Sequence, residues 1–203
     1  MSAYPLVLEG SGLEVLVVGG GSVAERKVRA LLAAGATVRV VAPTVSEGLR
    51  SMARRTAALS LLAREYAAGD VGRATLVVAA TDDRVINAAV AADARSLGRL
   101  VNVADSPAEG NAMTVATHRA GELVIAVFAG GVPAAAARIR DAIAERFDAR
   151  YAIAVGALVA LRRRLLEREG RGAWRVAMHA LVTDDFCDRV EGEMFAAEVT
   201  SWR

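Results

Sequence analysis

Short runs of apolar residues along this chain alternate with segments in which apolar and charged residues recur at helical spacing. The first run, residues 13–18, is rich in Val and Leu and is followed by a row of glycines. Such a run, largely apolar on both faces, is typical of a central parallel strand. Residues 22–34 then show a helical period that ends at Gly35, and a second strand is predicted over 37–41. Together these segments predict a complete βαβ unit.

The same alternation continues toward Pro107. Further helices are expected over 47–58 and 84–97, and further strands over 59–64, 75–80 and 100–103. Thr81, Asp82 and Asp83 stand directly before the second of these helices, where their oxygens can accept hydrogen bonds from first-turn N–H groups. Strands that alternate with helices form a parallel sheet with helices on both faces. We therefore predict the α/β class.

Beyond Pro107 the pattern changes. Residues 111–118 and 122–128 are strand-like around a turn at 119–121, and residues 134–147 predict a helix. Residues 148–168 and 174–200 predict two or more further helices, interrupted at 170–172. The chain is therefore expected to divide into a sheet domain over 1–110, a strand-and-helix region over 111–146, and a helical C-terminal domain over 147–203.

Composition and charge exclude several classes of protein. The 203 residues carry a formal net charge of +2 and are 54% hydrophobic, which excludes a disordered chain and gives no electrostatic footprint for nucleic acid. One cysteine and two histidines exclude an internal disulfide and the CxxC and HExxH metal motifs. The N-terminus has no signal-peptide pattern, and the longest uncharged run, 123–137, is short for a membrane span. We expect a soluble, cytoplasmic protein.

A glycine motif lies between the first strand and the first helix. Residues Gly19-Gly20-Gly21-Ser22-Val23-Ala24 match the pattern G-x-G-x-x-G/A, which places the pyrophosphate of a dinucleotide at a helix N-terminus. Gly19 permits the tight turn, Gly21 lets the backbone approach the phosphates, and Ala24 lets the helix pack closely on the strand. The alternative is a glycine turn with a purely structural role. With the strand and helix predicted around it, the motif favours a dinucleotide-binding Rossmann fold.

The second strand lacks the Asp or Glu that commonly binds the ribose 2′-hydroxyl of NAD. Pro43 and Thr44 follow this strand, and the hydroxyl of Thr44 or Ser46 could replace the carboxylate. Arg39 could instead bind the 2′-phosphate of NADP, or it could face solvent or a helix from within the strand. We favour NAD and leave NADP open.

Polar residues also follow the later strands, at the edge where open α/β sheets bind ligands. Thr81 and Asp82 follow one strand, and Asn102 and Asp105 end the next. Asp105 could act as a general base or orient a substrate, or it could simply form an Asx turn. The remaining candidates have structural interpretations: His118 on the surface, His179 partly buried, and Cys187 in a core or interface.

Four segments together point to one family. They are 17–27 (VVGGGSVAERK), 79–87 (AATDDRVIN), 101–107 (VNVADSP) and Ala129-Gly130-Gly131. In this order they resemble the precorrin-2 dehydrogenase and sirohydrochlorin ferrochelatase module of siroheme synthase, over essentially the whole chain. The resemblance implies an NAD-binding Rossmann domain, a dimerisation region and a C-terminal helical domain, which agrees with the three parts above. It also implies a homodimer.

The resemblance further implies the oxidation of precorrin-2, a tetrapyrrole, to sirohydrochlorin, with NAD as the hydride acceptor. In many members ferrous iron (Fe2+) is then inserted as the substrate of a chelatase activity. Asp105 would be the catalytic general base or the group that orients the substrate. The residues assigned to the cofactor are Gly19, Gly21, Ser22, Val23, Ala24, Pro43, Thr44, Thr81, Asp82 and Asn102.

The chain departs from the family at two places. It has Met113-Thr114 where members usually have Met-Pro, and residues 128–133 lack the serines that members usually carry. These departures weaken the prediction of iron insertion more than the prediction of NAD binding. Two alternatives stay open: a sensor module that binds a dinucleotide without catalysis, and a chelatase of the same fold that does not oxidise.

Overall fold

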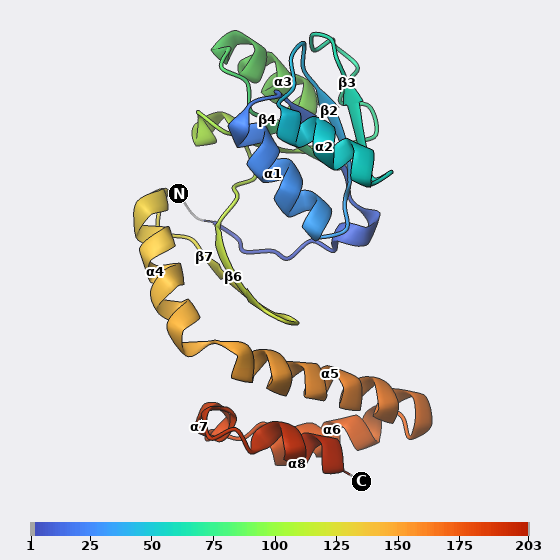
Figure 1. The fold of residues 1–203 in the computed structure, drawn as a ribbon, viewed down its shortest axis with the longest axis vertical. Coiled ribbons are helices and arrows are strands. Elements are labelled where there is room, and N and C mark those ends of the chain that lie inside the picture. The colour runs from blue at the N-terminus through green and yellow to red at the C-terminus, as the bar shows by residue number, and fades with distance from the viewer. Residues whose placement is uncertain (1–2, 203) are drawn as a thin grey trace. The chain divides into compact units, whose positions relative to one another are not determined.

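The computed structural model describes residues 3–202 and divides into two compact units, Met1–Thr114 and Val115–Arg203 (Figure 1). Each unit is built around buried apolar side chains of its own. The roles expected for the three parts of the sequence, which are cofactor binding, dimerisation and a separate helical domain, stay predictions.

In the described part of the first unit, five parallel strands form a sheet in the order β3-β2-β1-β4-β5. They are β1 (Glu14–Val18), β2 (Thr37–Val41), β3 (Leu59–Leu62), β4 (Leu76–Ala79) and β5 (Leu100–Val103). From β1 the chain moves outward to β2 and β3, then returns to the other side of β1 for β4 and β5. Ligands of such sheets bind where the order reverses, beyond the carboxyl ends of the strands. The predicted Rossmann-type α/β sheet is confirmed.

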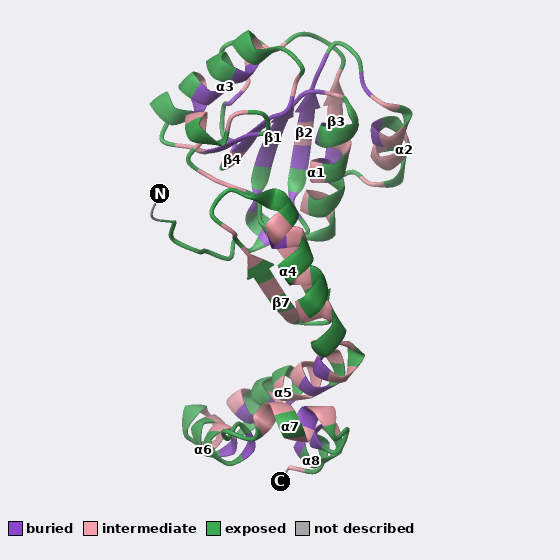
Figure 2. Cartoon of the chain, turned by 90° about the vertical axis from the view of Figure 1, so that its left-hand side faces the viewer, coloured by how far each residue is buried: buried purple, intermediate pink, exposed green. Residues whose placement is uncertain are grey.

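Helices α1 (Ser22–Ala33), α2 (Glu47–Arg55) and α3 (Arg84–Ser96) cover this sheet. Neighbouring residues of one strand enter different cores: Val17 of β1 packs with Val28 of α1, whereas Val18 packs with Val90 of α3. Figure 2 shows buried residues along the strands between these helices. Both faces of the sheet are therefore buried, as the largely apolar runs predict.

Two predicted boundaries are wrong for local reasons. The second helix ends at Arg55 rather than at residue 58, because Thr56 is extended and its hydroxyl accepts a hydrogen bond at 3.1 Å from the backbone two residues on. The strand predicted from residue 111 begins only at Ala116. Asn111 instead bonds β5, since its Oδ1 accepts from Val101 N at 2.7 Å and its backbone N donates to Val101 O at 3.0 Å.

The second unit begins with an antiparallel hairpin of β6 (Ala116–Ala120) and β7 (Leu123–Val127). The hairpin turns at Gly121, whose φ is 58°, and at Glu122, so the turn predicted at 119–121 is displaced toward the C-terminus. The helices that follow are α4 (Pro133–Arg146), α5 (Ala149–Arg168), α6 (Arg171–Leu181), α7 (Phe186–Glu191) and α8 (Phe195–Ser201). The interruption predicted over 170–172 is wrong, because the chain turns at Glu169 and Gly170 (φ 87°) and α6 already begins at Arg171.

The helices of the second unit share one apolar core. Tyr151 and Leu161 of α5 are buried together with Leu181 of α6, Val190 of α7 and Phe195 of α8. The last four of these side chains are aliphatic or aromatic without polar atoms, whereas the buried Tyr151 hydroxyl requires a hydrogen-bond partner.

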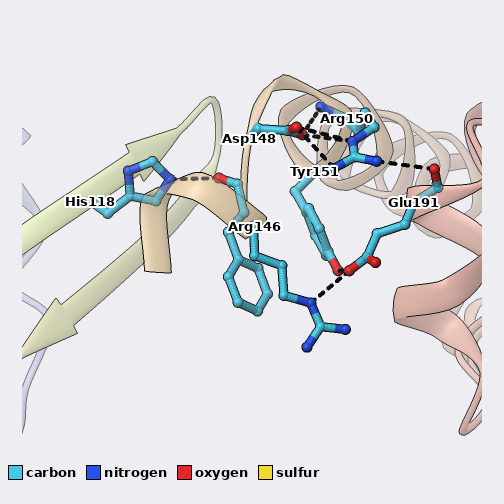
Figure 3. A network of polar contacts seen from close by, with 7 residues as sticks. His118, Arg146, Asp148, Arg150, Tyr151 and Glu191 are labelled. Atoms are coloured by element: carbon cyan, nitrogen blue, oxygen red, sulfur yellow. Dashed lines mark hydrogen bonds and ion pairs between the residues drawn. The ribbon is translucent and has the colours of Figure 1, made fainter. Parts of the chain in front are cut away.

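A network of polar contacts supplies that partner and joins α7 to the start of α5 (Figure 3). Glu191 Oε1 accepts hydrogen bonds from the Tyr151 hydroxyl at 2.8 Å and from Arg146 Nε at 2.7 Å. Arg150 donates to the Glu191 backbone oxygen at 3.1 Å, and the Asp148 carboxylate caps α5 by accepting from Arg150 N at 2.9 Å. The Arg146 guanidinium holds the pKa of the Glu191 carboxyl below its usual range. The network therefore ties α7 to the junction of α4 and α5.

The burial of the two histidines differs from what the sequence predicts. His118 is half-buried rather than on the surface, and its Nε2 lies 2.6 Å from the backbone oxygen of Phe147 (Figure 3). His179 is exposed rather than partly buried, because the buried residues of α6 are Ala177 and Leu181. Cys187 is half-buried and packs against the helical core, as predicted.

Candidate functional site

A cavity of about 860 Å³ opens in the first unit at the carboxyl ends of the central strands. Its size is typical of sites for small molecules and cofactors. The predicted cofactor residues that line it are Gly19, Gly21, Ser22, Val23, Pro43, Thr44, Thr81 and Asp82. They come from the loops after β1, β2 and β4, which the sheet order brings to one edge.

The first two glycines of the motif are required by the fold itself. Gly19 has a φ of +124°, and a Cβ at this position would lie 2.2 Å from the backbone oxygen of Ala80. A Cβ at Gly20 would lie 2.0 Å from the backbone oxygen of Thr44. The loops after β1, β2 and β4 therefore approach so closely that only glycine leaves room for their carbonyl groups.

Gly21 is different, because nothing in the protein requires it to be glycine. Its φ of −84° suits any residue, and a Cβ there would meet no atom within 4 Å. The space faces the start of α1, which has no side-chain cap. Unbonded first-turn N–H groups and the helix dipole favour an anion at such a position. An open cradle above uncapped N–H groups fits the pyrophosphate of a dinucleotide, whose approach a side chain at Gly21 would obstruct.

Ala24 lies outside the lining of the cavity. Its side chain is fully buried in the core between α1 and the sheet. The close packing predicted for the last position of the motif is therefore present, although the Ala24 side chain itself does not face the cavity.

Two groups considered from sequence for the ribose are occupied elsewhere. The Ser46 hydroxyl donates to Glu25 Oε2 at 2.7 Å and accepts from Leu49 N at 3.2 Å, so it caps α2. The Arg39 guanidinium donates to the backbone oxygen of Asp70 and does not line the cavity. Thr44 lies on the cavity wall, and its contact with the cofactor stays a prediction.

The cavity wall also contains two polar side chains that the sequence analysis did not predict, those of Glu65 and Tyr66. They follow β3, which pairs with β2 in parallel, so the loops after both strands rise from the same edge of the sheet. The Tyr66 hydroxyl donates to Asp93 Oδ2 at 2.6 Å, which fixes the ring against α3. No local motif marks this pair, but the strand order of the predicted Rossmann fold could have pointed to the loop.

Asn87 of α3 links the loops after β4 and β5. Its side chain is fully buried. Asn87 Oδ1 accepts from Thr81 N at 3.1 Å and from Thr81 Oγ1 at 2.8 Å. Asn87 Nδ2 donates to Thr81 O at 3.1 Å and to Asp105 Oδ1 at 3.0 Å. The structure therefore connects two predicted site residues, Thr81 on the cavity wall and the exposed Asp105, through one buried amide.

Asp82 and Asp83 have separate roles within the same loop. Asp83 caps α3, with Oδ1 accepting from Val85 N at 2.7 Å and from Ile86 N at 3.2 Å. This confirms the predicted helix cap and assigns it to Asp83. Asp82 instead lines the cavity, where its carboxylate is available to a ligand.

Asn102 lies outside the cavity lining and has a different set of partners. Its Oδ1 accepts from Lys27 Nζ at 2.7 Å, and its Nδ2 donates to Ala112 O at 3.1 Å. Lys27 also donates to Thr114 Oγ1 at 3.1 Å. Burial lowers the pKa of the Lys27 ammonium, and the neighbouring Arg26 lowers it further. Contact of Asn102 with the cofactor stays a prediction, and its observed role is to position Lys27.

Asn87→Ala is expected to lower the free energy of unfolding by about 1–3 kcal/mol, because it removes a fully buried side chain that makes four hydrogen bonds and leaves the backbone N–H of Thr81 without its acceptor. Urea denaturation of both proteins measures the difference. Asp82→Ala is the control, since Asp82 is an exposed residue of the same loop and its loss should change the free energy by less than about 0.5 kcal/mol. Equal stability of Asn87→Ala and the wild type would show that this amide does not hold the two loops.

Residues 6–116, which include the sheet and the cavity, match the family model described as "Putative NAD(P)-binding". The chain belongs to this NAD(P)-binding family. The match is in agreement with the cavity, whose glycine loop, uncapped helix start and strand-end polar groups suit a dinucleotide.

Similar proteins extend beyond the cofactor domain. A siroheme synthase of Pseudomonas putida strain F1 is 37% identical over 193 residues, which cover 91% of this chain and 41% of that protein. A siroheme synthase of Ectopseudomonas mendocina is 40% identical over 169 residues, covering 83% of this chain and 35% of that protein. This chain thus spans only about 35–41% of the length of these relatives. The solved structure of "SirC, precorrin-2 dehydrogenase" matches with a TM-score of 0.78 and 26% identity, covering 98% of this chain and 100% of that one. The resemblance to the precorrin-2 dehydrogenase module is confirmed.

Among residues 3–202, no three His, Cys, Asp or Glu side chains gather in a way that could hold a metal ion. Over the same residues, every helix is too short or too polar to cross a membrane.

Proposed function

We propose that this chain oxidises precorrin-2 to sirohydrochlorin with NAD as the hydride acceptor. The observation that carries the proposal is the link between a dinucleotide cavity and an exposed carboxylate: Thr81 of the cavity wall and Asp105 bond the same buried Asn87. The similarity to a precorrin-2 dehydrogenase over nearly the whole chain supports the choice of substrate.

Different residues of the chain would bind the cofactor and accept the proton in this reaction. NAD, when bound, supplies a carbon that accepts a hydride. The glycine loop and the start of α1 would hold its pyrophosphate, with Thr81 and Asp82 on the wall that the loop after β4 provides. Removal of two hydrogens from the substrate as a hydride and a proton requires a proton acceptor as well. Asp105 would supply it, because its carboxylate is exposed while Asn87 fixes Oδ1.

Incubation of the purified protein with precorrin-2 and NAD, without oxygen, tests the proposal. We expect NADH absorbance to rise with time. If no NADH forms from a substrate that a known dehydrogenase oxidises, the oxidation proposal is refuted. Dinucleotide binding without turnover would then favour the sensor module.

Insertion of ferrous iron into sirohydrochlorin is a separate hypothesis. The iron would be a substrate rather than a resident cofactor, bound by the nitrogens of the macrocycle. The chain would have to accept the protons that leave these nitrogens, and Asp105 is the exposed carboxylate held at the sheet edge. Sirohydrochlorin with ferrous or cobaltous ion, followed by its absorption spectrum, distinguishes a bifunctional enzyme from one that only oxidises.

We also propose that the protein is a cytoplasmic homodimer, with the second unit as its interface. The apolar side chains of Val124, Phe128, Val132 and Ile139 on and between β7 and α4 are exposed. Exposed apolar groups on neighbouring segments are typical of protein interfaces. Light scattering at micromolar concentration should give about twice the chain mass of 21.2 kDa. A mass equal to that of one chain would contradict the dimer.

A further inference from the structure

The cavity lacks a carboxylate at the position where dinucleotide-binding sheets commonly provide one. That carboxylate usually ends the second strand and accepts a hydrogen bond from the ribose 2′-hydroxyl. Here β2 ends at Val41 and is followed by Ala42 and Pro43. The Ser46 hydroxyl is engaged with Glu25 and the start of α2. Thr44, which follows Pro43, lines the cavity but carries no charge, so a carboxylate acceptor would have to come from another part of the cavity wall.

Glu65 is a carboxylate that reaches this cavity from the neighbouring strand. The last residues of β2 and β3, Val41 and Leu62, are paired in register. The loop that follows β3 therefore starts beside the end of β2, where the missing acid would have been. Glu65 lines the cavity and is exposed, so its carboxylate is accessible to a ligand.

The loop that carries Glu65 is held in place on both sides. Asp70 accepts two hydrogen bonds from Arg64, at 2.7 and 2.6 Å, and a third from Ala67 N at 2.9 Å. The Tyr66 hydroxyl is anchored on Asp93 of α3. The residues immediately before and after Glu65 are therefore fixed, which limits the directions that its side chain can take.

The same contacts remove the positive charges that a phosphate would need. Two arginines at this loop, Arg39 and Arg64, both bond Asp70, one at its backbone oxygen and the other at its carboxylate. Arg64 holds the pKa of the Asp70 carboxyl below its usual range, so the pair stays charged at neutral pH. The described lining of the cavity contains Glu65 and Asp82 but neither Lys nor Arg.

We propose that Glu65 accepts a hydrogen bond from the adenosine ribose of NAD and repels the 2′-phosphate of NADP. Glu65 thus takes the part of the acid usually found after the second strand, and it selects NAD. The inference rests on the proposed NAD-dependent function. It specifies which side chain decides between the two dinucleotides.

Titration of the full chain with NADH and with NADPH, followed by nicotinamide fluorescence, tests the proposal without any turnover. We expect the wild type to bind NADH at least roughly tenfold more tightly than NADPH. With NADPH, the hydrogen bond from the ribose 2′-hydroxyl to the Glu65 carboxylate is lost, and the 2′-phosphate is brought close to that negative carboxylate. Glu65→Gln should weaken NADH binding and strengthen NADPH binding, so that the two affinities approach each other.

Two control variants keep the test specific. Glu122→Gln removes an exposed carboxylate of the second unit and should leave both affinities unchanged. Asp82→Asn removes the other carboxylate of the cavity wall and should leave the ratio of the two affinities as in the wild type. Equal wild-type affinities for NADH and NADPH, or an unchanged ratio of the two affinities in Glu65→Gln, would refute the role of Glu65 but not the proposed function. Failure of a folded wild-type protein to bind either dinucleotide would refute the proposed function, and this inference with it.

Discussion

Asp105→Asn should slow precorrin-2 oxidation by about 10²–10⁴-fold, the usual contribution of a general base, while NADH affinity stays as in the wild type. The asparagine keeps an oxygen that can accept the hydrogen bond from Asn87 Nδ2, now 3.0 Å from Asp105 Oδ1. The variant therefore removes the proton acceptor with little change of shape. Initial rates with saturating NAD, together with NADH titration, separate turnover from binding.

The outcome distinguishes the enzyme from a sensor. A sensor that only binds a dinucleotide has no use for a base at this place, so Asp105→Asn would leave all its properties unchanged. Retention of full turnover in Asp105→Asn would contradict the role given to Asp105. Loss of NADH affinity along with turnover would instead assign Asp105 to cofactor binding, which its position outside the cavity lining does not predict.

Three consecutive glycines offer a second test, because substitution by alanine should weaken cofactor binding at Gly21 but reduce stability at Gly19 and Gly20. Gly21→Ala should fold with a free energy of unfolding within about 1 kcal/mol of the wild type, since its φ is ordinary and its Cβ meets no protein atom within 4 Å. It should bind NADH at least about tenfold more weakly, because the methyl group occupies the space through which the phosphates approach α1.

Gly19→Ala and Gly20→Ala are the matched comparison. Their new methyl groups would lie 2.2 and 2.0 Å from the backbone oxygens of Ala80 and Thr44, which cannot move without disturbing the strand ends. We expect both to lose more than about 2 kcal/mol of stability in urea denaturation. Wild-type NADH affinity in Gly21→Ala would show that the pyrophosphate does not lie above the start of α1.

The alternation of strands and helices in the first unit could be predicted because both faces of its sheet are buried. The spacing of apolar residues along the sequence reflects this burial directly. Some of the wrong boundaries occur where a side chain bonds the backbone in place of the regular secondary structure. Asn111 bonds the backbone of β5 and so delays the start of β6, although the apolar residues around it resemble a strand. Between α5 and α6 the chain turns over Glu169 and Gly170 only, because the positive φ of Gly170 lets Arg171 and Gly172 join the next helix instead of the predicted interruption.

The residues of the candidate site that belong to a contiguous sequence motif could be predicted, and the others could not. The glycine loop and the residues after β4 line the cavity as expected. Glu65 and Tyr66 belong to no motif, and their place depends on the pairing of β3 with β2. Asn87 was part of a segment that indicated the family, but helical spacing shows only that it faces inward. Its four hydrogen bonds depend on where two distant loops end.

The proposed hydride transfer from a tetrapyrrole to NAD can be tested by measuring both products of a single anaerobic reaction of the purified protein with precorrin-2 and NAD. Spectra recorded together give the amounts of NADH and of sirohydrochlorin. We expect the two products to rise in equal amounts, and neither to rise with Asp105→Asn on the same time scale. Sirohydrochlorin that forms without NADH, or NAD that binds while both products stay absent, would contradict the proposed hydride transfer.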